Sequence, residues 1–200
     1  MMEYWIKSIH PSFHYSKKFF KHFTQQFETA FRQIQNLDLI YFMPHVEIYT
    51  DGSARSNPGR GGYGTILKFG EKEKELSQGF RLTTNNRMEL MAVIVGLESL
   101  TREGLDVIIY SDSKYVVDSV EKKWVFGWQK KGFKDKKNPD LWMRFLKVFP
   151  KHKVKFKWIK GHNDHPYNER CDVLATTAAD GRHLLVDEVY EKTEKEGMFD

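Results

Sequence analysis

The sequence predicts an α/β fold: a mixed five-stranded sheet, with three antiparallel strands followed by parallel additions, flanked by helices. Three strand-like segments after residue 44 are separated only by glycine-containing turns, which is typical of an antiparallel run. Two later strand-like segments each follow a helical segment, and strand–helix–strand units place their strands parallel. A last helical segment completes the expected order, βββαβααβα.

The antiparallel run begins with residues 45–50, where apolar and polar side chains alternate. Asp51 comes next, so we expect it at the end of this strand. Residues 57–62 combine proline with glycines and predict a turn. Two further strands are expected near 63–69 and 75–81.

The first helix is expected to begin near residue 86. Asn86 is followed three residues later by Glu89, a spacing that resembles a capping box and places Glu89 in the first helical turn. Apolar residues then recur at helical spacing: Met88, Met91, Ala92, Val95 and Leu97.

The second half of the chain supplies the parallel strands. Residues 106–110 are short and β-branched, and Asp112 follows them, again at a strand end and just before a helical stretch. A helix is expected over 139–149, the last strand over 154–159, and a final helix from Pro166 to about residue 179.

Composition narrows the class of protein. The chain has 200 residues, of which 40% are hydrophobic and 30% charged, and this favours a packed globular domain. Its single cysteine, Cys171, excludes an intramolecular disulfide and a cysteine zinc cluster, and fits a reducing compartment. No apolar run reaches the roughly 18 residues of a membrane span. We therefore expect a cytoplasmic monomer without a transmembrane segment.

Charge divides the chain into three segments. The net charge is +2 over residues 1–44, +6 over 45–180 and −3 over 181–200. The positive charge belongs mainly to the middle segment, which favours a polyanionic partner. Seven lysines and one acid lie within 122–137, interleaved with aromatic residues.

Four acids are candidates for one site. Two lie at the ends of strands that should be neighbours, where ligands of open α/β sheets bind, and two lie on helices able to face the same space. Clustered carboxylates repel one another unless a cation neutralises them, and all-oxygen ligation favours Mg²⁺ or Mn²⁺. The alternative, that these acids are turn formers and solvated charges, stays open on position alone. The four are Asp51, Glu89, Asp112 and Asp172.

Six motifs, in this order, resemble type 1 ribonuclease H in its bacterial form over residues 45–180. They are Tyr49–Ser53, Asn57–Gly59, Gly61–Gly64, Thr83–Leu90, Ser111–Ser113, and Gly161–His162 with Asn168–Asp172. The resemblance implies a ribonuclease H-like sheet and an endonuclease that cuts the RNA strand of RNA/DNA hybrids, leaves 5′-phosphates and removes primers and R-loops. It also implies that the four acids hold two Mg²⁺ ions, which Mn²⁺ can replace, with His162 assisting proton handling or product departure.

Hybrid recognition requires contacts to both strands. Amides can sense the RNA 2′-hydroxyl by donating and accepting hydrogen bonds, which suits Asn57, Asn85 and Asn86. By similarity, a phosphate of the DNA strand would be held by Arg81, Thr83 and Asn138. In the lysine-rich stretch, the expected DNA-strand contacts are Trp124, Lys130 and Lys131.

Other interpretations stay open at this point. A non-catalytic hybrid-binding module would share the binding residues, and another nuclease of the same superfold would share the fold. In residues 1–44, phenylalanines recur every four residues from Phe19 to Phe31, which indicates an amphipathic helix; a targeting peptide and a true start at Met43 are the alternatives. The acidic end of the chain, 187–200, is expected to be a short helix or solvated.

Overall fold

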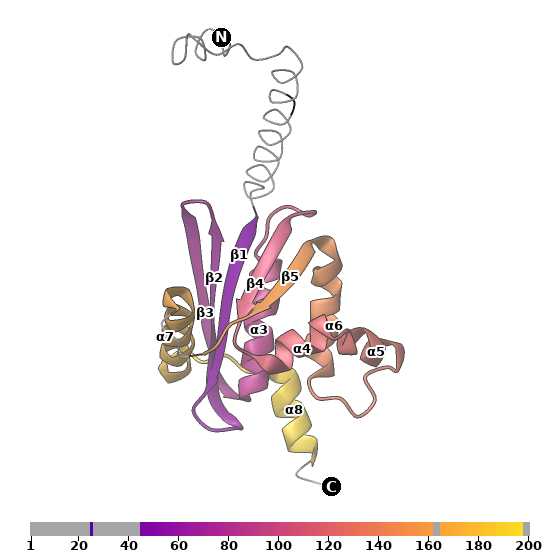
Figure 1. Cartoon of the computed structure of the whole chain (residues 1–200). Coiled ribbons are helices and arrows are strands. Elements are labelled where there is room, and N and C mark those ends of the chain that lie inside the picture. Colours follow the sequence, from indigo (N-terminus) through magenta and orange to yellow (C-terminus); the bar gives the residue numbers. More distant parts are fainter. Residues whose placement is uncertain (1–24, 26–44, 162–164, 198–200) are drawn as a thin grey trace, which may run out of the picture. The chain divides into compact units, whose positions relative to one another are not determined.

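A computed structural model describes residues 25, 45–161 and 165–197 of the chain (Figure 1). The chain divides into two units, Met1–Met43 and Pro44–Asp200. The phenylalanine-rich helix expected within 1–44 lies outside the described residues, apart from the single position 25. The second unit, which carries every candidate site residue, is described below.

Five strands form one mixed sheet, which confirms the predicted fold class. Strands β1 (Val46–Ala54), β2 (Gly59–Phe69) and β3 (Lys72–Thr83) are antiparallel, whereas β4 (Asp106–Ser111) and β5 (Lys153–Trp158) add in parallel. The order across the sheet is β3-β2-β1-β4-β5. The two parallel strands therefore extend the sheet beyond β1.

Helices cover both faces of the sheet (Figure 1). Helix α7 packs on one face against β1, β2 and β3, while α3 and α4 pack on the other and α6 lies against α3. Helices α5 and α8 are additions to the predicted order. Among the described residues, no helix is long and apolar enough to cross a membrane. The helical elements are α3 (Asn85–Glu98), α4 (Lys114–Glu121), α5 (Trp124–Lys130), α6 (Pro139–Val148) with a 3-10 turn (Phe149–Lys151), α7 (Pro166–Asp180) and α8 (Glu188–Gly197).

The first strand is longer than predicted. It continues to Ala54, so the expectation that Asp51 ends the strand is wrong. The reason is that β1 has two neighbours of different reach. Pairing with β4 stops at Thr50, whereas the hairpin with β2 continues to Ala54. Asp51 is thus the first residue of β1 beyond the edge of β4.

The capping box predicted at the start of α3 is also absent. The N-cap is Thr84, with no side-chain hydrogen bond to the helix, and Asn86 lies inside the helix. Glu89 is the fifth helical residue, beyond the first turn, and is buried. Its carboxylate faces other acids, so it cannot serve the backbone amides at the helix start.

The hydrophobic core lies between the sheet and the helices α3, α4 and α6. Among its fully buried side chains are Trp142 and Phe145 of α6, Ile48 of β1 and Ile109 of β4. Because α3 packs on β1 and β2, its polar N-terminal end is held beside the point where β4 stops. The core thereby fixes the start of α3 relative to the end of β4, and the candidate acids lie at this point.

Within the acidic end of the chain, residues Glu188–Gly197 form helix α8, which belongs to the second unit and favours the short-helix alternative. The chain reaches this helix by running along β3. Leu185 makes a parallel bridge with Phe80, accepts a hydrogen bond from the Arg81 amide at 3.0 Å and donates one to the Gly79 carbonyl at 2.8 Å. The end of the chain is therefore a structural part of the domain.

Candidate active site

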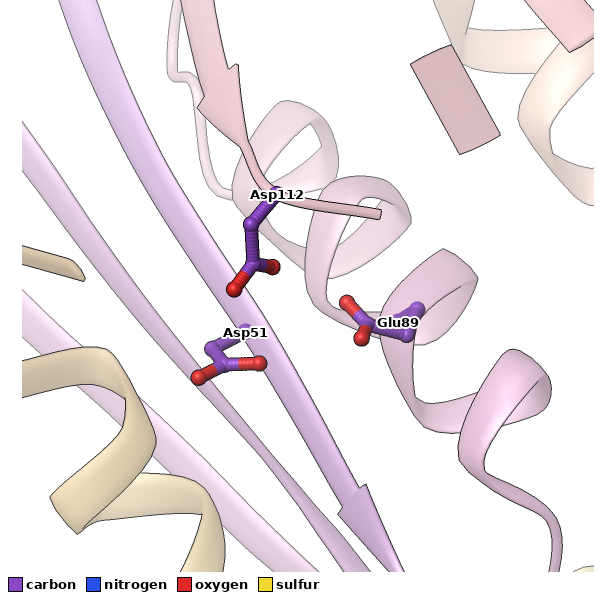
Figure 2. Close-up of side chains that lie close together, drawn as sticks. All are labelled: Asp51, Glu89 and Asp112. Atoms are coloured by element: carbon purple, nitrogen blue, oxygen red, sulfur yellow. The ribbon is translucent and has the colours of Figure 1, made fainter. Parts of the chain in front are cut away.

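Three carboxylates from separate elements meet where the pairing of the inner strands β1 and β4 ends (Figure 2). Asp51 comes from β1, Asp112 follows β4 and Glu89 comes from α3. Because β1 and β4 are parallel and their pairing ends at Thr50 and Ser111, the next residue of each strand is an aspartate at the same edge. One oxygen of each carboxylate lies within 4.8 Å of the others. These three residues are called the carboxylate cluster below.

Two glycines allow the surrounding helices to approach. A Cβ atom on Gly52 would lie 2.1 Å from the backbone nitrogen of Glu89, so only glycine lets α3 come this close to β1. A Cβ atom on Gly64 would lie 2.2 Å from the carbonyl oxygen of Cys171, so the same holds for α7 and β2. Gly64 pairs directly with Asp51, and this brings Asp172, the residue after Cys171, toward the cluster.

Burial and mutual repulsion perturb the cluster. Burial, followed by the charges of Asp112 and Asp172, raises the pKa of Asp51 to about 8, although a 2.7 Å hydrogen bond donated by the Gly52 amide acts in the opposite direction. Burial is also the largest cause of the raised pKa of Glu89, and the charges of Asp51 and Asp112 add to it. The cluster therefore carries negative charge at a free-energy cost.

The cluster fits a divalent cation. Its donors are all carboxylate oxygens, which Mg²⁺ and Mn²⁺ prefer. Glu89 Oε2 is buried and has no hydrogen-bond partner among the described residues. A cation would satisfy this oxygen and remove the repulsion that raises the pKa of Asp51 and Glu89.

Asp172 stands apart from the cluster. It lies on α7 and is half-buried, and its charge contributes to the raised pKa of Asp51. However, it is not among the carboxylates whose oxygens lie within 4.8 Å of one another. The structure thus brings three of the four predicted acids into contact distance of one ion and places the fourth nearby.

Asp112 has supports that the sequence interpretation missed. Its side chain accepts a 3.4 Å hydrogen bond from Asn168 Nδ2, and its carbonyl accepts a 3.0 Å bond from Trp158 Nε1. Asn168 precedes Asp172 by four residues, one helical turn, and this spacing could have identified it. A Cβ atom on Gly161 would lie 2.6 Å from Asp112 Oδ2, so the chain passes close to this carboxylate at Gly161, where the predicted loop begins. The predicted His162 in that loop lies outside the described residues.

The predicted RNA-reading amides form a path to the cluster. Asn57 Oδ1 accepts a 3.2 Å hydrogen bond from the backbone N–H of Asn85, and the side-chain Nδ2 of Asn85 donates a 3.3 Å bond to Glu89 Oε1. Asn86 is exposed beside them. The structure thus brings all three asparagines together, and hydrogen bonds connect Asn57 and Asn85 to a carboxylate of the cluster.

Residues 122–137 form a projecting basic segment around α5 (Figure 1). The side chain of Trp124 is 47% exposed, and Lys130 and Lys131 are exposed as well. Trp128 instead packs edge-on against a tryptophan of α6, with the ring centroids 5.8 Å apart. The two tryptophans therefore differ: Trp124 is available to a ligand, whereas Trp128 holds the segment on the domain.

Two of the three predicted phosphate contacts already bind carboxylates of the same chain. The Arg81 guanidinium pairs with Glu191 at 2.7 Å, and Thr83, fully buried, donates a 2.8 Å hydrogen bond to Asp187. Asn138 differs because it lines a pocket of about 540 Å³. Other residues that line this pocket include Asn57, Thr84, Asn86, Lys136 and Lys137.

Known proteins similar to this chain agree with the geometry. The family model described as RNase H matches residues 43–180. Ribonuclease H of Lachnoclostridium phytofermentans is 56% identical over 157 residues, which cover 73% of this chain and 99% of that protein. Ribonuclease H of Rippkaea orientalis is 52% identical over 151 residues, covering 73% and 92%.

The solved structures point in the same direction. LC9-RNase H1, described as a type 1 RNase H with the type 2 active-site motif, has a TM-score of 0.61 and 32% identity, covering 74% of this chain and 80% of that one. RNase H1 of Halobacterium salinarum has a TM-score of 0.53 and 26% identity, covering 68% and 98%. Because the family model matches more than half of the chain, the chain belongs to the RNase H family, in its type 1 form.

Proposed function

We propose that this protein is an endonuclease that hydrolyses the RNA strand of RNA/DNA hybrids with Mg²⁺ as cofactor, Mn²⁺ being able to replace it. The observation that supports this most is the carboxylate cluster, in which three acids from β1, α3 and the end of β4 lie within 4.8 Å. A fold keeps buried like charges together at a cost in stability, and a bound cation is the simplest reason for it.

The chain's own residues hold the ligands in place. The Gly52 amide orients Asp51, Asn168 and Trp158 orient Asp112, and Asn85 orients Glu89. Two divalent ions would be held by the cluster and by Asp172, and when bound they would supply the charge that activates a water and stabilises the departing 3′ oxygen. Cleavage of the bond between phosphorus and the 3′ oxygen leaves a 5′-phosphate on the product. His162 would assist proton handling or product departure.

Recognition of the hybrid is divided between two surfaces. Asn57, Asn85 and Asn86 sense the 2′-hydroxyl of the RNA strand, and the hydrogen bonds from Asn57 through Asn85 to Glu89 support this role. Trp124, Lys130 and Lys131 contact the DNA strand on the basic segment. The pocket at Asn138 takes a phosphate of that strand. Thr84 lines this pocket and replaces Thr83 as the threonine that contacts the phosphate, because Thr83 is bonded to Asp187. Arg81 is paired with Glu191 and has only an indirect role. Such contacts position the duplex and carry little sequence preference.

In the cell, we expect the protein to remove RNA primers and R-loops as a cytoplasmic monomer. Both tasks present RNA paired with DNA. Gel filtration with light scattering tests the oligomeric state, and accumulation of R-loops after deletion of the gene tests the task.

The test uses the full chain with four labelled substrates: RNA/DNA hybrid, RNA duplex, DNA duplex and a four-way DNA junction. We expect Mg²⁺-dependent cleavage of the hybrid alone, abolished by EDTA. Asp51→Asn should lower the rate more than about a hundredfold. Loss of a residue that only orients a metal ligand costs about 10–100-fold, and Asp51 is itself a proposed ligand. The control is Asp106→Asn, an exposed acid at the opposite end of β4, which should retain activity.

Three outcomes contradict the proposal. Binding of hybrid without cleavage identifies a non-catalytic module, and cleavage of the junction in preference to the hybrid identifies another nuclease of the same superfold. Unchanged cleavage by Asp51→Asn excludes the carboxylate cluster as the metal site.

A further inference from the structure

The segment that leads into α8 is anchored by two buried acids. Asp187, 5% exposed, accepts hydrogen bonds from Thr83 and, at 2.7 Å, from the guanidinium of Arg87. One turn later, Glu191 accepts bonds of 2.7 to 3.1 Å from the guanidinium of Arg81. Charge-assisted bonds from arginines to buried carboxylates fix orientation as well as position. The first turn of α8 is thus held in one place on the domain.

This anchoring turns one face of α8 toward the pocket at Asn138. Tyr190, Thr193 and Glu194 follow the three- and four-residue spacing of a single helix face, and all three line the pocket. The ring of Tyr190 lies 5.4 Å from the guanidinium carbon of Arg87, a buried residue that also lines the pocket. The end of the chain therefore forms one side of the pocket.

The two walls of this pocket carry opposite charge. Lys136 and Lys137 are exposed on one wall, beside the amide of Asn138. Glu194 is exposed on the α8 wall. Arg87 adds little free charge, because Asp140 and Asp187 both pair with it. An anion in the pocket is therefore attracted from one side and repelled from the other.

We propose that α8 is a wall of the pocket that receives a DNA-strand phosphate and that the Glu194 carboxylate weakens the binding of that phosphate. The inference rests on the proposed function. Glu194 then limits the affinity for the hybrid without touching the reacting atoms. Its effect is electrostatic, so salt should reduce it.

The test measures the Kd of a fluorescently labelled RNA/DNA hybrid by anisotropy in EDTA, at low and at high salt. Glu194→Gln should lower the Kd about twofold to fivefold at low salt, the range expected for one exposed charge interaction, and Glu194→Lys should lower it further. The matched control is Glu188→Gln: it makes the same charge change on the same helix, but it lines a different pocket, near Met91 and Arg144.

Equal effects of Glu194→Gln and Glu188→Gln on the Kd would overturn the inference, because they would reflect net charge alone. An effect that persists unchanged at high salt would also overturn it. Because binding is measured without metal, these outcomes are independent of cleavage, which is assayed separately in Mg²⁺ and decides the proposed function. Glu194 is exposed, so the melting temperature of each variant should match that of the wild type.

Discussion

Two buried charges of opposite sign lie two residues apart on α3 and have neighbours of the same kind. Arg87 is 2% exposed and Glu89 is 6% exposed. Arg87 faces two carboxylates, those of Asp140 and Asp187, at 2.7 Å. Glu89 also faces two carboxylates, those of Asp51 and Asp112. The neighbours are of one kind, and only the sign of the central charge differs.

The difference separates architecture from chemistry. Burial alone would lower the pKa of Arg87, but the hydrogen bonds to Asp140 and Asp187 outweigh it and raise that pKa, so this group is stably charged. At Glu89, burial and the neighbouring charges act together and raise the pKa. A buried charge with its counter-ions built in holds the fold together, whereas one without them is prepared for a cation from solution.

The largest expected effect comes from breaking the compensated side. Arg87→Met removes the cation and leaves two acids unpaired, so we expect a loss of about 3–5 kcal/mol in the free energy of unfolding, measured by urea denaturation. The matched control is Arg144→Met, whose partner Glu98 is exposed; it should cost about 0–1 kcal/mol. Equal losses in the two variants would show that burial does not distinguish the pairs.

An intermediate effect is expected from completing the uncompensated side. At an Mg²⁺ concentration one hundred times its Kd, the wild-type protein should gain about 2.7 kcal/mol of stability, measured as a shift in denaturant midpoint. In Asp51→Asn the same concentration should give a clearly smaller gain, because one ligand is lost. A gain of the same size in this variant would mean that Mg²⁺ binds elsewhere.

The smallest effect, taken per pH unit and per group, is the pH dependence of the metal-free protein. The pKa of Asp51 is near 8 in the folded state and near 3.8 in a model peptide, so the folded state binds more protons between these values. Stability should therefore fall as pH rises from 6 to 8, by at most about 1.4 kcal/mol per pH unit and group.

The same linkage predicts how a variant behaves. Asp51→Asn removes the repulsion that Asp51 contributes, although Glu89 and Asp112 still repel each other, so the metal-free stability of this variant should exceed that of the wild type at pH 8 and vary less with pH. Thermal unfolding in EDTA at several pH values measures both. A wild-type protein that becomes more stable from pH 6 to pH 8, relative to this variant, would contradict the raised pKa.

Much of this was predictable because the signals are local. Alternation over 45–50, β-branched residues over 106–110 and helical spacing after residue 86 each predict an element from neighbouring residues, and the fold class follows from their order. The motifs likewise identified Asp51, Glu89 and Asp112. Boundaries were less accessible: β1 outlasts its expected end because β2 continues to pair with it after β4 has stopped.

The sequence by itself determined the order of the elements, the sheet class and three of the acids that converge, since these depend on periodicity and on motifs a few residues long. Only the tertiary structure decided that Thr83 faces inward, that Asp187 and Glu191 close on Arg87 and Arg81, and that Asp172 stands apart from the cluster. The Thr83, Arg87 and Arg81 contacts join residues 100 to 110 positions apart. No local pattern encodes such contacts, because they depend on where the end of the chain docks once the sheet has formed.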